Sequence, residues 1–352
     1  MKKCAYLLTI LVIFTLFGLK TYAEEDFDDY ISDFEDLLPE DMEGETMDRL
    51  SVEGILSGVV ESVKGERGRL GVFFLTTLGV ICLSALASLA PPPLSESVSA
   101  VVGILSSAAL FSTVSSLVSE VLLSLDKISK FFSAFIPISV GVTALGGAEG
   151  TALAQGSGMY ISLSLLSRLS GGIFSTVSAL SLGSALLSPL GGQIVSSFGG
   201  MVKSVFTRAM GIFTAILTGA FALQTIVTSS ADNAAMRAAR YMASGLIPVV
   251  GSTVSGALST LASGMSYAKG IIGGGAVSVL LFFALTPLTT ILLYRLCLTA
   301  AIGISDMLGA DSSRILSAYR SALDIALALY ALSTLIYLFE IIIFLKSGVA
   351  LV

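Results

Sequence analysis

Residues 70–93 read LGVFFLTTLGVICLSALASLAPPP, and this stretch decides the fold class. Its first 21 residues carry no charge. A helix needs about 20 apolar residues to cross the hydrocarbon core of a bilayer. Three prolines then end the helix, because proline lacks the backbone N–H and its ring clashes with the preceding turn. The sequence therefore predicts a transmembrane helix over 70–90.

The remainder of the 352-residue chain has the same character: 54% of all residues are apolar, 12% are charged, and the mean hydropathy is +0.92. Soluble domains carry about 25% charged residues, so an ordinary soluble globule is excluded. Backbone groups in lipid must bond within their own segment, which favours helices. We expect an all-α polytopic integral membrane protein of about seven transmembrane helices plus interfacial helices. Its transmembrane domain is expected over 67–352, with further spans at 98–125, 131–148, 156–190, 209–230, 271–304 and 321–346.

The N-terminal residues 1–23 have the pattern of a secretory signal peptide. Lys2 and Lys3 precede an apolar run, and Ala23 offers a small residue for cleavage before Glu24. An uncleaved anchor is the alternative, and either one places Glu24 on the far side of the membrane. Residues 24–66 then carry 16 acidic residues against two basic ones, which predicts an acidic extracytoplasmic lead. A short amphipathic helix is expected within it, from Val52.

The chain lacks the residues that several classes of protein function need. The chain has no His, and its three Cys are far apart in apolar surroundings, so neither the usual catalytic triads nor a CxxC metal spacing exists. The glycine clusters are not followed by the Gly-Lys-Ser/Thr of a phosphate-binding loop. We expect no catalytic, cofactor-binding or metal site and no enzymatic activity. No dense basic face indicates nucleic-acid binding.

A basic helix is predicted between the fifth and sixth candidate spans, at 231–246. Arg237 and Arg240 share one of its faces, beside an apolar stripe that ends at Leu246. Such a helix is typical of a membrane interface, with basic side chains at the headgroups. The two arginines are candidates for contact with anionic lipid or with carboxylates of a partner protein, and the sequence leaves both open.

Small residues recur at every fourth position in two segments. Gly211, Ala215 and Gly219 do so in the fifth span. A second ridge contains Gly256 and Gly264. This spacing lets helix backbones approach closely in a membrane. The five residues are candidate helix-packing positions, within one subunit or between the subunits of a homo-oligomer.

Ionisable residues within apolar segments are functional candidates, because charge is costly in lipid. Arg168, Gln224 and Arg295 are the candidate polar residues of a conduit, and Arg168 has apolar sequence on both sides. The alternative is that these side chains reach to the interface or pair between helices. The ionisable residues in or near the spans are Glu120, Glu149, Arg168, Arg295, Asp324 and Glu340.

Four segments carry a family resemblance, and they are 54–66 (GILSGVVESVKGE), 238–251 (AARYMASGLIPVVG), 286–296 (TPLTTILLYRL) and 309–311 (GAD). With the signal peptide and the acidic lead before them, the chain resembles the stage III sporulation protein AE family of endospore-forming bacteria. Its lead is richer in acid, its spans richer in Ser and Gly, and its C-terminus shorter than is usual for that family.

The resemblance implies a multi-pass protein of the mother-cell membrane around the forespore. It implies partners among the other stage III sporulation A-operon membrane proteins and ring components, with which the family builds a secretion-like transenvelope channel required for endospore development. The family has no established catalytic residues. Two alternatives remain, a self-contained small-solute transporter and a passive membrane scaffold for ring proteins. A transporter often carries an internal repeat, and none is evident here.

Overall fold

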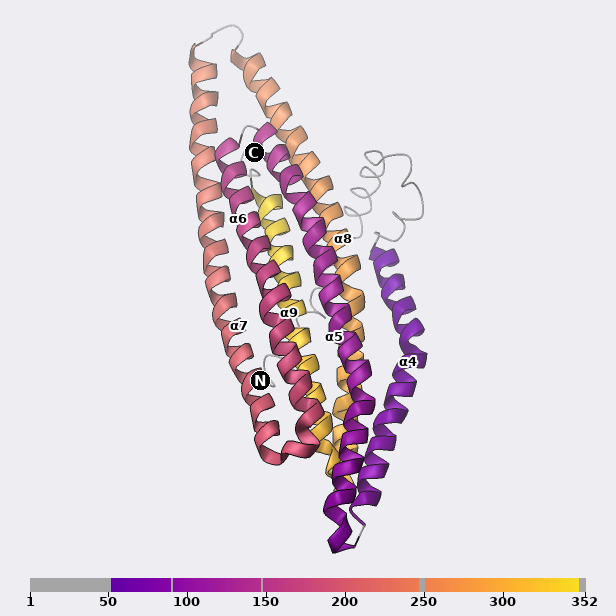
Figure 1. The fold of residues 1–352 in the computed structure, drawn as a ribbon. Helices are drawn as coiled ribbons and strands as arrows, with labels where there is room; N and C mark the ends of the chain where they lie inside the picture. Colours follow the sequence, from indigo (N-terminus) through magenta and orange to yellow (C-terminus); the bar gives the residue numbers. More distant parts are fainter. Residues whose placement is uncertain (1–51, 90, 147, 247–250, 348–352) are drawn as a thin grey trace.

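A computed structural model describes residues 52–347 apart from residues 90, 147 and 247–250, and all its regular structure is helical. The long helices lie side by side in one elongated bundle (Figure 1). The predicted all-α fold is therefore confirmed for this part of the chain; the predicted signal peptide and most of the acidic lead lie outside it. The elements are α4 (Val52–Ala87), α5 (Pro92–Leu145), α6 (Glu149–Arg168), the π-helix η2 (Leu169–Phe174), α7 (Ser175–Leu246), α8 (Gly251–Met307) and α9 (Ser312–Lys346).

The described residues contain six segments that are long and apolar enough to cross a membrane, rather than about seven. The difference lies in α5, since the predicted spans 98–125 and 131–148 form one continuous helix. The sequence between them looked like a loop because it contains Asp126 and Lys130. Lys130 Nζ instead lies 2.6 Å from an Asp126 carboxylate oxygen, as an i,i+4 pair on the helix surface. Such a pair supports a helix.

The predicted 156–190 segment is interrupted by the π-helix η2 but continues through it to Leu190. The chain reverses further on, within α7. A Cβ built on Gly199 would lie 2.7 Å from Ser184 Oγ. In a straight helix, two residues 15 positions apart are separated by about 22 Å along the axis, so the chain must fold back between them. The glycine pair Gly191-Gly192 lies between the two, and α6 lies beside the later part of α7 (Figure 1).

Two helices run further than the sequence predicted. The amphipathic helix expected from Val52 is continuous with the first span, as α4. The basic helix expected at 231–246 is the last part of α7. No loop separates either from its neighbouring span.

Helix α9 is the centre of the bundle and contacts every other described helix. More than half of the most apolar stretch of α9 is buried, a larger buried share than in any of the other five membrane-length segments. Three tyrosines of α9 are fully buried, Tyr319, Tyr330 and Tyr337. Their hydroxyls bond serines of α5 at 2.7–3.0 Å, namely Ser107, Ser124 and Ser129 in the same order. These bonds fix the register of α9 on α5.

Two of these hydroxyl pairs also satisfy carbonyls that prolines leave free. Pro287 has no N–H, so the carbonyl of Phe283 one turn earlier has no helical partner. Tyr330 Oη and Ser124 Oγ lie 3.0 and 3.3 Å from that carbonyl, so one hydroxyl donates to it while the other donates within the pair. The bundle therefore contains a proline within α8 without an orphaned buried acceptor.

The same arrangement occurs at Pro189 in α7. The carbonyl of Ala185, four residues before the proline, accepts a bond from Ser107 Oγ at 3.0 Å. Tyr319 Oη in turn donates to the Ser107 carbonyl at 2.7 Å. Helices α5 and α9 thus supply the polar groups that two interrupted helices require.

Candidate functional site

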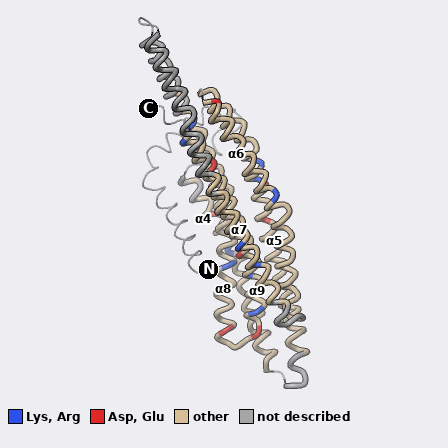
Figure 2. The backbone as a smooth tube through the Cα atoms, turned by 90° about the vertical axis from the view of Figure 1, so that its left-hand side faces the viewer, with Lys and Arg blue, Asp and Glu red and all other residues tan. Residues whose placement is uncertain are grey.

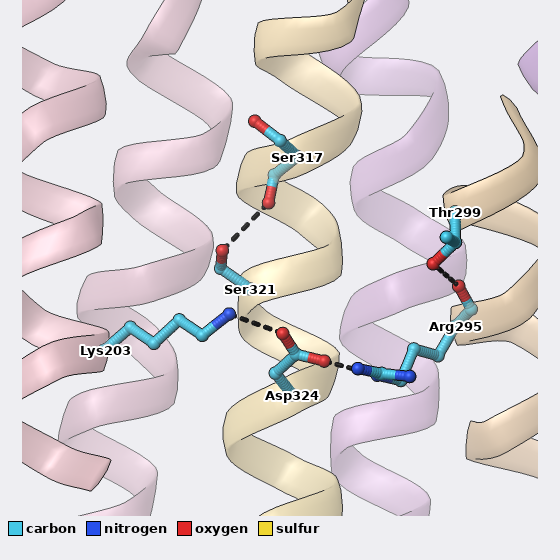
Figure 3. Close-up of polar contacts among 6 residues, drawn as sticks. All are labelled: Lys203, Arg295, Thr299, Ser317, Ser321 and Asp324. Atoms are coloured by element: carbon cyan, nitrogen blue, oxygen red, sulfur yellow. Dashed lines mark hydrogen bonds and ion pairs between the residues drawn. The ribbon is translucent and has the colours of Figure 1, made fainter. Parts of the chain in front are cut away.

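Charged residues occur at several heights in the described part of the bundle, including its middle (Figure 2). In the middle, Asp324 of α9 lies between two cations from neighbouring helices (Figure 3). One carboxylate oxygen pairs with Lys203 Nζ of α7, and the other accepts a bond from Arg295 Nε of α8 at 2.5 Å. We call these three residues the charge triad. It joins the three helices α7, α8 and α9 through one carboxylate.

The charge triad is mostly shielded, with side chains 15%, 16% and 27% exposed for Lys203, Asp324 and Arg295. Charges at this depth must be paired, because an unpaired ion in a low-dielectric interior is costly. The nearby hydroxyls of Ser321 and Thr299 bond carbonyls of their own helices instead (Figure 3). Asp324 therefore depends on its two cations, and the triad has the chemistry of a structural clamp.

A second polar group is buried among α5, α6, α8 and α9. Glu340 is fully buried, and one of its oxygens accepts a bond from Ser162 Oγ at 2.6 Å. Nearby, Ser347 Oγ donates to Gln155 Oε1 at 3.1 Å. Lys269 Nζ donates to the Ser347 carbonyl at 2.7 Å and lies 5.7 Å from the centre of the Phe344 ring. These contacts bind the C-terminal end of α9 to its neighbours.

The structure brings together only some of the ionisable residues that the sequence singled out. Arg295 and Asp324 are partners, and Glu340 pairs with Ser162. Arg168 is exposed at the end of α6, and Glu120 and Glu149 are exposed too. The side chain of Gln224 lies outside the described residues, as do those of Arg237 and Arg240, so their predicted roles stay predictions. Sequence reasoning missed Lys203, which it placed in a loop.

The predicted small-residue ridges show no close packing within this chain where the structure describes them. A Cβ built on Gly211, Gly219 or Gly264 meets no atom within 4 Å, and Ala215 is exposed. The surroundings of Gly256 lie outside what the structure describes, and packing against a second subunit stays a prediction. Close approach occurs instead at other glycines. The sequence did not single out Gly103 and Gly156, whereas Gly199 and Gly273 belong to glycine clusters that it predicted to be breaks or close-packing sites in helices.

No group of three or more metal-ligating side chains that could hold an ion is present among the described residues. Their polar side chains bond mainly to one another and to backbone carbonyls, as in the triad and the tyrosine–serine pairs. The arrangement is one that holds helices together at fixed positions.

Comparison with known proteins adds one match. The family model for stage III sporulation protein AE matches residues 33–348. The chain belongs to the stage III sporulation protein AE family. Searches of curated proteins and of solved structures found no match. Membership in this family places the protein in sporulation, and the six long apolar segments among its described residues indicate a membrane protein.

Proposed function

We propose that this protein is a non-catalytic membrane component of the mother cell–forespore transenvelope channel required for endospore development. The observation that carries the proposal is the family match, which extends over residues 33–348 and so includes almost every described helix. The multi-pass localisation in the mother-cell membrane around the forespore is part of the same proposal.

The geometry supports a role in assembly. Charges in the middle of the bundle are paired between helices, and buried hydroxyls bond proline-freed carbonyls. Such contacts fix helix positions, as a component that presents a defined surface to partners requires. We propose the other stage III sporulation A-operon membrane proteins and ring components as these partners, with a homo-oligomer as a further assembly.

The predicted basic face remains part of this proposal. Arg237 and Arg240 would bind either anionic lipid or carboxylates of a partner. Lipid attraction depends mainly on charge, whereas paired carboxylate bonds need the guanidinium fork. Replacing both arginines with lysine separates the two, because sporulation should persist in the first case and fail in the second.

Reconstitution tests the channel role against the self-contained transporter. The purified chain is placed in liposomes alone and then with the other membrane components and ring proteins. Solute flux that requires the partners supports the proposal. Flux through the lone chain at the same rate would instead establish a transporter. Deletion of the gene should block sporulation after engulfment, and a deletion strain that sporulates normally would overturn the proposal.

A further inference from the structure

Three adjoining cavities lie between α4, α5 and α8. Their volumes are 510, 760 and 450 Å³, and Glu120 lines all three. Glu66 and Arg69 line two of them. We call the three together the α4 crevice. Apart from Gly54, its lining residues belong to three of the segments long enough to cross a membrane.

The crevice exists because α4 presents glycines to it. Gly58, Gly65 and Gly68 line the cavities, and a Cβ built on any of them would meet no atom within 4 Å. Each glycine in a helix costs about 0.5–1 kcal/mol relative to alanine. No close helix contact requires these glycines, so what they provide is open space.

The lining of the crevice combines ionisable and hydroxyl-bearing side chains with apolar ones such as Val72, Phe73 and Phe282. Glu66 accepts bonds from Arg69 and from the hydroxyl of Tyr294, both at 3.2 Å. Ionisable residues within membrane segments face the bundle interior or a water-filled cavity. Hydroxyl-bearing residues complete the walls, including Ser62, Thr76, Ser112, Thr113, Ser116 and Thr290.

The size of the crevice also fits water. A water molecule takes about 30 Å³ in the liquid, so each cavity has room for on the order of fifteen or more. Cavities of about 300–1,000 Å³ are typical of sites for small molecules. The charged groups that line cavities of this size would be costly to leave without water.

We infer that the α4 crevice is an aqueous vestibule within the membrane part of the protein, open to water and small hydrophilic solutes. Helix α4 forms its outer wall. This goes beyond the proposed function, because the crevice belongs to the lone chain and would exist whether or not partners are bound.

Thiol labelling of the full chain in liposomes tests the inference. Single cysteines are introduced as Ser116→Cys in the crevice and Ser119→Cys as the matched control, in a background with Cys4→Ser, Cys82→Ser and Cys297→Ala. Ser119 lies on the same helix at nearly the same height and is exposed, but lines none of the three cavities. A small cationic, membrane-impermeant methanethiosulfonate is added to both sides.

The reagent attacks thiolates, which form in water and not in lipid. The crevice cysteine should react at least about tenfold faster than the control, and both should react fully after denaturation. Equal rates, or labelling of the crevice cysteine only after denaturation, would overturn the inference.

A second pair of variants tests whether the space itself admits the reagent. Gly68 lines the same cavity as Ser116, and a Cβ there meets no atom within 4 Å, so Gly68→Leu should slow labelling of Ser116→Cys several-fold. Gly71→Leu, also on α4 and also facing open space, lines none of the three cavities and should leave the rate unchanged. If the two leucines have the same effect, the reagent does not enter through the crevice.

Discussion

Asp324 is shared by two cations, so the three members of the charge triad should not contribute equally to stability. Removing Lys203 leaves Asp324 with Arg295, and removing Arg295 leaves it with Lys203. Removing the carboxylate leaves two half-buried cations without a partner. The effect of a substitution therefore depends on the number of ions that it orphans.

We predict that Asp324→Asn lowers the free energy of unfolding by about 2–3 kcal/mol and that Lys203→Met and Arg295→Met each cost about half as much. Thermal unfolding in detergent measures the difference. Asp306→Asn, at an exposed site near the end of α8, is the control and should be neutral. A loss for Asp324→Asn no larger than that for Lys203→Met would contradict the shared-carboxylate arrangement.

At this scale the sequence predicted that Arg295 and Asp324 matter, because each is a charge within an apolar run. It did not predict their partners. Lys203 and Asp324 are 121 residues apart, and no local pattern encodes a contact over that distance. Lys203 lies between the predicted spans 156–190 and 209–230 and was therefore placed in a loop; in the structure it lies in α7, past the reversal of that helix.

At the scale of elements, the Phe283 carbonyl, which Pro287 leaves without a helical partner, gives a prediction that a second substitution should reverse. Ser124→Ala together with Tyr330→Phe removes both hydroxyls that can donate to the Phe283 carbonyl and leaves it without a protein donor. The expected loss is about 1–3 kcal/mol of unfolding free energy. Pro287→Ala returns an N–H to the helix, so the same double substitution should cost clearly less in that background.

Unfolding of the four proteins in a detergent titration measures this coupling as a double-mutant cycle. Equal losses with proline and with alanine at position 287 would mean that the two hydroxyls act only on each other. Their mutual bond, 2.7 Å long, is removed in both backgrounds and so cancels in the comparison.

The glycines of α5 and α7 should respond to alanine with opposite signs. A Cβ built on Gly103 would lie 2.7 Å from Cβ of Pro189, a rigid ring that cannot move aside. Gly103→Ala should therefore destabilise by about 1–3 kcal/mol. Gly211→Ala finds open space and should stabilise by up to about 1 kcal/mol through helix propensity. Melting temperatures that fall equally would show that Gly211 also has a close neighbour, supplied by another subunit.

The elements themselves were predictable to a large extent, since uncharged runs of about 20 residues leave few alternatives in lipid. The continuity of α5 between the predicted spans 98–125 and 131–148 was not predictable, because a helix surface tolerates a charged pair as readily as a loop does. Two of the close-packing glycines were missed for a related reason. Periodic spacing marks Gly211 and Gly264, whereas the contacts of Gly103 and Gly156 depend on which helices meet.

At the scale of the whole molecule, six crossings predict that the start of α4 and the end of α9 lie on the same side of the membrane. Side-specific reporters fused ahead of Val52 and after Lys346 measure this directly. Reporters on opposite sides would mean an odd number of spans, with α5 crossing the membrane twice, as the predicted spans 98–125 and 131–148 require.

The central position of α9 also has a consequence for how the protein is made. Residues 312–346 leave the ribosome after every helix that they hold together. Until then Lys203 and Arg295 have no carboxylate, and the carbonyl of Phe283 lacks one of the two hydroxyls that can donate to it. Helices α4–α8 also pack against one another, so part of the bundle can form during translation. The charge triad and the tyrosine–serine pairs are complete only after α9 has emerged, and quality control of the nascent chain has that interval in which to act.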